Sequence, residues 1–267
     1  MAKARNPRGQ MSLGGHLKEL RKRFFWVALF IIAGAVVGWY LFEPVFNALQ
    51  QPIIRTAKNA HINATVNFST IGGAFDLRLQ VSAFIGVVIT SPLWLYQFWA
   101  FIVPALKRKE KLYTAGFLGA AIPLFLGGCY MAWLAIPSFV NALLSMTPRG
   151  SANLISANEY ILFAIRILLV FGIAFVLPVV LVLLNFMGLL TSRGIIKGWR
   201  VAVVVSAFIA ALATPVADPT SMFLLMVPLM VLYFVAAGIA WFRDRWRRRH
   251  MDPEILAAQL EVESETN

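Results

Sequence analysis

The chain has 267 residues, of which 60% are hydrophobic and only 13% are charged. Soluble globular proteins are about 45–50% apolar and about 25% charged, so the composition excludes that class and indicates an integral membrane protein. The formal net charge is +12. In a soluble chain this excess would suggest nucleic-acid binding, but here the bases flank apolar segments, so we attribute them to membrane topology and expect no nucleic-acid partner.

Six apolar segments approach or exceed the roughly 20 helical residues that a bilayer core requires. In chain order they cover residues 24–42, 81–103, 113–136, 160–188, 199–213 and 221–242. We therefore predict an all-α polytopic membrane protein with six transmembrane helices. Residues 24–242 form its transmembrane domain, residues 1–23 a cytoplasmic segment with an amphipathic helix, and residues 243–267 a basic and then acidic tail.

Two features of these segments predict irregular helices. The fifth segment is short, since about 15 helical residues cover only about 22 Å, which is less than the hydrocarbon core. Prolines lie inside four of the segments and predict local bends, because membrane helices tolerate them. These prolines are Pro92, Pro123, Pro178 and Pro228.

The bases divide unevenly between the two sides of the membrane. Six spans put both termini on one side, and that side carries 19 of the 24 Lys and Arg residues. The opposite loops carry four, which are Arg55, Lys58, Arg78 and Arg149. Basic loops stay in the cytoplasm, so we predict that both termini are cytoplasmic. The long external connection 43–80 contains two prolines and a Gly pair, which predicts short helices lying at the surface.

The sequence offers few groups for catalysis or metal binding. Cys129 is the single cysteine and can form no internal disulfide, and the three histidines show no metal-ligand spacing. Arg166 lies inside the fourth span, close enough to its outer end for the stem to snorkel, so we favour a structural role. We predict no enzyme and no cofactor. A six-span small-solute carrier or channel is the alternative function, although the spans hold few polar residues for a pathway.

Two isolated carboxylates stand on the basic cytoplasmic face. Glu19 is the only acid among the seven bases of residues 1–23, and Glu110 is the only acid among the four bases of residues 104–112. Either acid could simply pair with a neighbour, as Glu19 could with Arg23 at helical spacing, for only tenths of a kcal/mol. Together, two such carboxylates suggest a site that accepts a cation.

Four stretches of the chain resemble motifs of the TatC family, the multi-spanning subunit of the twin-arginine protein translocase. Two match its cytoplasmic signatures, H-L-K-E-L-R-K-R at 16–23 and P-L-W-L-Y-Q-F-W-A-F-I-V-P-A-L-K-R-K-E at 92–110. The others are F-G-I-A-F-V-L-P at 171–178 and T-P-V-A-D-P at 214–219. The resemblance covers about residues 10–245, with similar span number, orientation and loop lengths.

The resemblance implies a receptor and core subunit that binds twin-arginine signal peptides and exports folded proteins with the proton-motive force. It implies a prokaryotic plasma membrane, single-span partners similar to TatA and TatB, and a homo-oligomeric assembly. Signal-peptide binding would fall to Glu19, Glu110, Arg21, Arg23 and Phe101.

The resemblance also implies roles at the external side. Pro52 matches a proline that shapes the first external loop, and partner helices would dock near Thr214, Asp218 and Met222. Two positions depart from the family pattern. Val176 stands where the family often has Glu, and Met222 stands where it often has Gln, which bears on polar contacts with a partner inside the membrane.

Overall fold

The computed structural model describes residues 13–59, 64–68, 70–102, 111–145, 153–213 and 219–249. The first half of the chain contains α1 (Leu13–Tyr40), α2 (Phe42–Asn59), β1 (Ala64–Asn67), α3 (Gly73–Ile89), α4 (Ser91–Ile102) and α5 (Lys111–Ser145). The second half contains β2 (Asn153–Ser156), α6 (Ala157–Phe186), α7 (Ser192–Lys197), α8 (Trp199–Ala213) and α9 (Pro219–Arg249). Within these ranges the regular structure is helical apart from one short ribbon, which confirms the predicted all-α membrane class.

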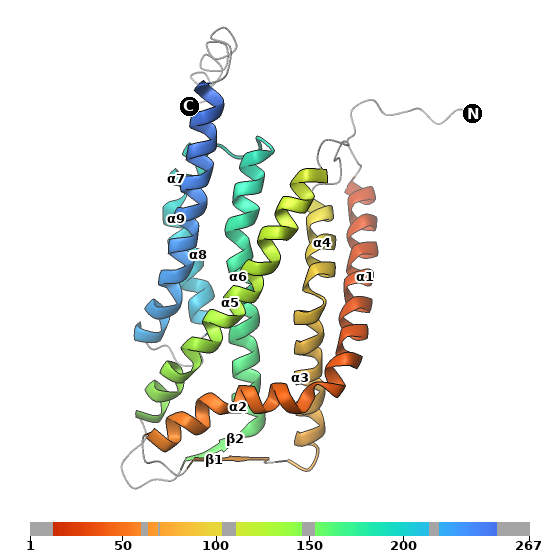
Figure 1. Ribbon diagram of the computed structural model, residues 1–267, viewed down its shortest axis with the longest axis vertical. Coiled ribbons are helices and arrows are strands. Elements are labelled where there is room, and N and C mark those ends of the chain that lie inside the picture. Colours follow the sequence, from red (N-terminus) through yellow and green to blue (C-terminus); the bar gives the residue numbers. More distant parts are fainter. Residues whose placement is uncertain are drawn as a thin grey trace, which may run out of the picture.

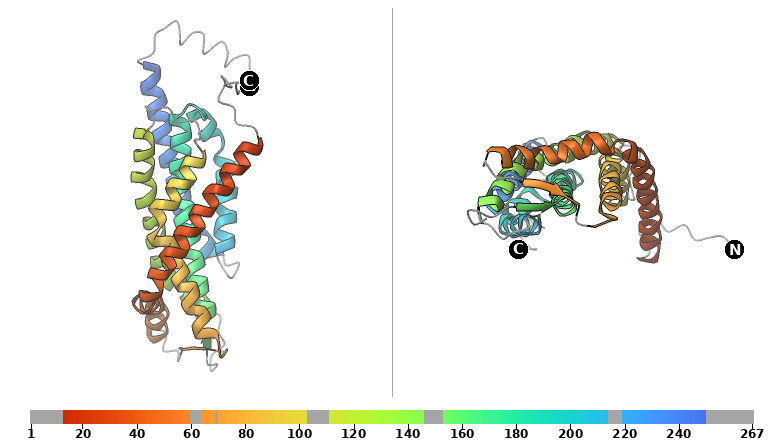
Figure 2. Two further views of the ribbon diagram at one scale, coloured as in Figure 1. Left: turned by 90° about the vertical axis from the view of Figure 1, so that its right-hand side faces the viewer. Right: turned by 90° about the horizontal axis from the view of Figure 1, so that it is seen from below.

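The long helices stand side by side, and α2 crosses one end of them (Figure 1). The start of α1 and the end of α9 both lie at the opposite end. Helix α1 stands at one edge of the molecule and α9 on the opposite side (Figure 1), and the view from below again shows α1 at the edge (Figure 2). The predicted amphipathic segment and the first span form one continuous helix, α1.

Among the described residues, four helical stretches are long and apolar enough to cross a membrane. They are Gly14–Tyr40, Ala115–Asn141, Ala157–Phe186 and Leu225–Arg247. The fifth predicted span is the shorter apolar helix Trp199–Ala211, as its length indicated. These five helices lie at the positions of five of the six predicted spans, although the shortest is below the length needed to cross a membrane.

The second predicted span, 81–103, is not one straight helix. Helices α3 and α4 pass the length test only together, and they are bent by 62° relative to each other. The break falls at Thr90, whose hydroxyl donates to the carbonyl oxygen of Gly86 at 2.7 Å. Pro92 follows in the first turn of α4, where its missing N–H costs no helical hydrogen bond. The bend predicted at Pro92 is therefore confirmed, whereas the other three prolines lie inside uninterrupted helices.

Trp94 satisfies one of the backbone groups released by this bend. Its indole Nε1 donates to the carbonyl oxygen of Val87 at 2.9 Å, across the junction between α3 and α4. Such a bond matters because an unsatisfied carbonyl costs several kcal/mol in hydrocarbon.

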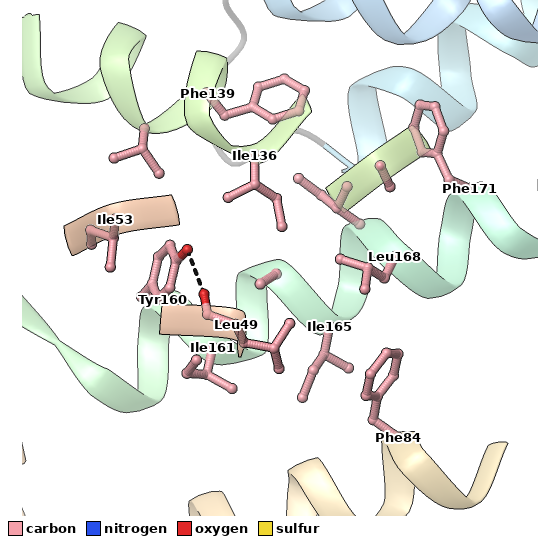
Figure 3. Close-up of a cluster of buried hydrophobic side chains, with 14 of the residues drawn as sticks. Leu49, Ile53, Phe84, Ile136, Phe139, Tyr160, Ile161, Ile165, Leu168 and Phe171 are labelled. Atoms are coloured by element: carbon pink, nitrogen blue, oxygen red, sulfur yellow. Dashed lines mark hydrogen bonds between the residues drawn. The ribbon is translucent and has the colours of Figure 1, made fainter. Parts of the chain in front are cut away.

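The main buried core lies between α2, α3, α5, α6 and the start of α9. Ile136 and Phe139 of α5 and Ile161 of α6 are at most 2% exposed. Helix α2 confirms the surface helix expected within residues 43–80, and it contributes Leu49 and Ile53 to this core (Figure 3).

One hydrogen bond ties α2 to α6. Tyr160 donates its hydroxyl to the carbonyl oxygen of Leu49 at 2.9 Å, as the dashed line in Figure 3 shows. Pro52 is buried on the same helix, one turn further along.

A two-stranded parallel ribbon is the element that the sequence analysis did not anticipate. Strand β1 pairs with β2 from Ala64 opposite Asn153 to Asn67 opposite Ser156. The ribbon joins the connection after α2 to the residues immediately before α6, at the end of the molecule that α2 crosses (Figure 1). Each strand has only four residues, too few for an alternating pattern to be distinguished from a loop.

Helices α1 and α3 approach each other closely at glycines. A Cβ atom at Gly86 would lie 2.7 Å from the backbone nitrogen of Ala35 and 2.7 Å from the carbonyl oxygen of Ile31. A Cβ atom at Gly38 would collide with the carbonyl oxygen of Ser82. Small residues permit such backbone contact between membrane helices, and here they set the distance between α1 and α3.

We predict that Gly86→Ala lowers the stability of the protein by about 1–3 kcal/mol, because the added methyl group forces α1 away from α3. The measurement is thermal unfolding in detergent. Gly119→Ala is the matched control, because a Cβ atom at this helical glycine meets nothing within 4 Å. Equal melting temperatures for the two variants would contradict the close approach.

Candidate functional site

Glu19 and Arg23 form an ion pair one turn apart on α1. The Nη2 and Nε atoms of Arg23 lie 2.6 Å and 3.1 Å from the same oxygen of Glu19, Oε1. The side chains are 20% and 22% exposed, so the pair is partly shielded from solvent. The local pairing that the sequence left open is therefore present, and it occupies one carboxylate oxygen.

The second oxygen of Glu19 has no such bond. Its Oε2 atom is buried and has no hydrogen-bond partner among the described residues. A buried acceptor without a partner costs about 1–3 kcal/mol, so this oxygen is favourably placed to receive a further donor.

Arg23 also links α1 to α4. Its Nη1 atom donates to Oε1 of Gln97 at 3.2 Å. Gln97 lies in the second of the two stretches that resemble family signatures, so a hydrogen bond joins the two stretches directly.

A cavity of about 210 Å³ lies beside this pair, between α1 and α4. Its lining is apolar except for Arg23 and Gln97, and it consists of Leu20, Arg23, Phe24, Val27, Trp94, Gln97, Phe98 and Phe101. Phe24 is 71% exposed and Phe98 is 45% exposed, so the cavity opens at the surface. At one end the ring of Phe101 stacks on His16 with centroids 4.5 Å apart.

The structure thus brings three of the sequence-predicted binding residues together, Glu19, Arg23 and Phe101. Arg21 is exposed on α1 and lies outside this group. Glu110 lies outside the described residues, so its relation to the group stays a prediction.

The residues predicted at the other end of the molecule are only partly described. Thr214 and Asp218 lie outside the described residues. Met222 lies near the start of α9 and packs against the main core. Val176 is buried in a second cluster between α4, α5 and α6, while Arg166 is exposed on α6.

Gln97 is the site residue that sequence analysis missed. The sequence contains a signal, since a lone amide stands in an aromatic run, but the role of Gln97 depends on the placement of α4 against α1.

A second missed feature is a polar cluster centred on Asp244 of α9, at the end of the molecule where α1 begins. Its carboxylate accepts from the backbone nitrogen of Ser192 at 2.8 Å and from Nδ2 of Asn185 at 3.2 Å.

Arg243 completes this second cluster. Its Nη2 atom donates to the carbonyl oxygen of Phe186 at 2.7 Å, and its guanidinium lies 4.6 Å from the centre of the Phe186 ring. These contacts fasten the end of α6 to α9. We assign the cluster a structural role, because its donors and acceptors are hydrogen-bonded to one another.

These features define an integral membrane protein of the polytopic α-helical class, with a polar pair and an apolar cavity at one end. The family described as Sec-independent protein translocase protein (TatC) matches residues 15–228. This chain belongs to the TatC family.

Individual relatives agree with the family match. The chain is 43% identical to the Sec-independent protein translocase protein TatC of Xylanimonas cellulosilytica, over 92% of this chain and 89% of that one. It is 32% identical to TatCy of Bacillus subtilis, over 94% and 97% of the two chains. A crystal structure of the twin-arginine translocase receptor TatC superposes with a TM-score of 0.72 at 28% identity, covering 85% of this chain and 98% of that one. The relatives are translocase components, which is a transport role.

We predict that Glu19 and Arg23 are energetically coupled by about 1 kcal/mol, because their pair is partly shielded from solvent. A double-mutant cycle with Glu19→Gln and Arg23→Gln, read by unfolding in detergent, measures this coupling. Arg21→Gln combined with Glu19→Gln is the control, because residues two apart do not face each other on a helix. If the coupling energy of the control were as large as that of Glu19 and Arg23, the coupling would come from the net charge of α1 and not from the ion pair.

Proposed function

We propose that this chain is the receptor and core subunit of a twin-arginine translocase. In this role it binds twin-arginine signal peptides and exports folded proteins across a prokaryotic plasma membrane, using the proton-motive force. The observation that carries the proposal is the half-buried carboxylate of Glu19, one oxygen of which has no hydrogen-bond partner in the part of the chain that the structure describes and lies near an apolar cavity. Membership of the TatC family supports it.

The chemistry of the cavity suits a signal peptide. An arginine of the peptide presents a planar fork of N–H donors, and it can bind Oε2 of Glu19 while Arg23 holds Oε1. Gln97 keeps Arg23 turned toward α4, so the pair is oriented before the peptide arrives. Signal peptides continue into an apolar stretch, and Phe24 and Phe98 offer exposed apolar surface for it.

The second arginine requires a second carboxylate, and we assign that role to Glu110. Glu110 directly precedes α5 in the sequence and follows the segment after α4. The many bases around the two acids repel stray cations, so only a ligand that satisfies both carboxylates binds well. Arg21 contributes to this positive surround from the exposed side of α1.

Single-span proteins similar to TatA and TatB are the proposed partners, in an assembly with several copies of this chain. Helix α8 has 15 residues and extends only about 22 Å, which is less than the hydrocarbon core, so the backbone carbonyls at its end require a neighbour that shields them. We place the docking of a partner helix at this end of α8, near Thr214, Asp218 and Met222. Pro52 supports the same external end through the buried face of α2.

We predict that Glu19→Ala and Glu110→Ala each weaken binding of a twin-arginine peptide by roughly one to two decades, because each removes charge-assisted hydrogen bonds worth about 1.5–3 kcal/mol. The measurement is site-specific crosslinking to the peptide in membranes, and the double variant abolishes export. A peptide with two lysines also binds weakly, since it keeps the charge but lacks the fork.

Glu43→Ala is the matched control for these variants. Glu43 is exposed at the start of α2, at the end of the molecule away from the cavity, so its removal leaves crosslinking unchanged. Unchanged crosslinking and export in Glu19→Ala and Glu110→Ala would instead mean that both acids serve only local ion pairs.

The proposed topology has six spans and cytoplasmic termini, because 19 bases lie on one side and four on the other. We predict that, in a Cys129→Ala background, a cysteine at Glu43 reacts with a membrane-impermeant maleimide in intact cells. A cysteine that replaces the exposed Lys197 reacts only after the cells are opened, and so does a cysteine that replaces Lys109. Labelling of either of these two cysteines in intact cells would show that the topology is the reverse of the proposed one.

A further inference from the structure

An apolar groove lies between α6, α7, α8 and α9, at the other side of the molecule from the candidate site. Its cavity volume is about 490 Å³. Leu177 of α6 and Val201 and Val205 of α8 line it and are 42%, 67% and 43% exposed. Partly exposed lining residues mean that the groove opens on the outer surface of the helices, which faces hydrocarbon in a membrane.

The groove matches an extended apolar chain. Its lining runs along α8 from Gly198 to Ile209, which is about 16 Å of helix. A cavity of about 490 Å³ along this length suits a thin, flexible ligand such as a lipid acyl chain.

One end of the groove is basic. Arg193, Lys197 and Arg200 each adjoin a lining residue in the sequence, and all three are exposed. The guanidinium of Arg200 lies 5.8 Å from the ring of Trp199, which is 46% exposed. A tryptophan beside bases is typical of the headgroup level of a membrane, where both find polar surroundings.

Asp244 of α9 makes its hydrogen bonds with groups other than Lys197 and Arg200. Asp244 is engaged by the backbone nitrogen of Ser192 and by Asn185, on the side of α7 that faces α9. The hydroxyl of Tyr233, which lines the groove, donates to the carbonyl oxygen of Ile195 and so holds α7 over the groove end. The groove therefore combines a fixed apolar channel with a positive end.

We propose that this groove is a binding site for an anionic phospholipid. One acyl chain lies along α8, against Leu177, Val201 and Val205, and the phosphate contacts Lys197 and Arg200. The apolar walls alone would accept a chain from any lipid, whereas the bases select a headgroup with net negative charge. This site is separate from the peptide cavity between α1 and α4.

The experiment is native mass spectrometry of the full-length protein with equal amounts of phosphatidylglycerol and phosphatidylcholine that carry identical acyl chains. The wild-type protein retains phosphatidylglycerol preferentially. In Lys197→Gln/Arg200→Gln the preference falls about tenfold to thirtyfold, because each base near an anionic headgroup contributes roughly fivefold. Arg245→Gln/Arg247→Gln is the matched control, since it removes two exposed bases of α9 outside the groove and keeps the preference.

Two further variants test the apolar part. Ala202→Phe fills the groove and lowers retention of both lipids, and a photoreactive residue at Val205 forms an adduct with lipid in membranes. If Ala202→Phe does not fold, the exposed double variant still decides the headgroup contact. Equal retention of both lipids by the wild type, loss of preference in the control, or a polypeptide adduct at Val205 would each overturn the proposal.

Discussion

The close approach of α1 to α3 determines whether the candidate site exists, because half of the site stands on α1 at the edge of the molecule. Gly86 lets the two backbones come together, and Arg78 of α3 contacts the end of α1 nearest to α2. The Arg78 guanidinium lies 4.5 Å from the ring centre of Trp39 and donates to that residue's carbonyl oxygen at 3.4 Å. Together these contacts fix the direction in which α1 continues toward Glu19.

The bend at Thr90 then supplies the other half of the site. If α4 continued α3 in a straight line, the aromatic residues of α4 would lie elsewhere. The 62° bend instead places α4 beside the first turns of α1. Gln97 consequently reaches Arg23, and Phe101 reaches His16. A threonine hydroxyl and a tryptophan indole each donate to a backbone carbonyl at the bend, which lowers the cost of the break at membrane depth.

Two acids at the same end of the molecule show how similar charges acquire different roles. Asp244 accepts hydrogen bonds from Ser192 and Asn185 and lies 4.0 Å from Arg243. Glu19 binds Arg23 through one oxygen only. The sequence predicted a role for Glu19 and located the apolar segments, because a lone charge and long apolar runs are visible locally. It could not reveal the role of Gln97 or of Asn185, since each depends on a helix that arrives from elsewhere in the chain.

The parallel ribbon could not be predicted from the local sequence for the same reason, because its two strands lie far apart in the chain. This separation has a consequence for biogenesis. Ala64 and Asn153 face each other although about 90 residues separate them, and all of α3, α4 and α5 lie in between. Chains are made from the N-terminus, so β1 has no partner until α5 has crossed the membrane and the residues before α6 have emerged. Pairing that spans so long a segment is also slow to find. The ribbon therefore closes the end of the molecule that α2 crosses only after the preceding helices have been made.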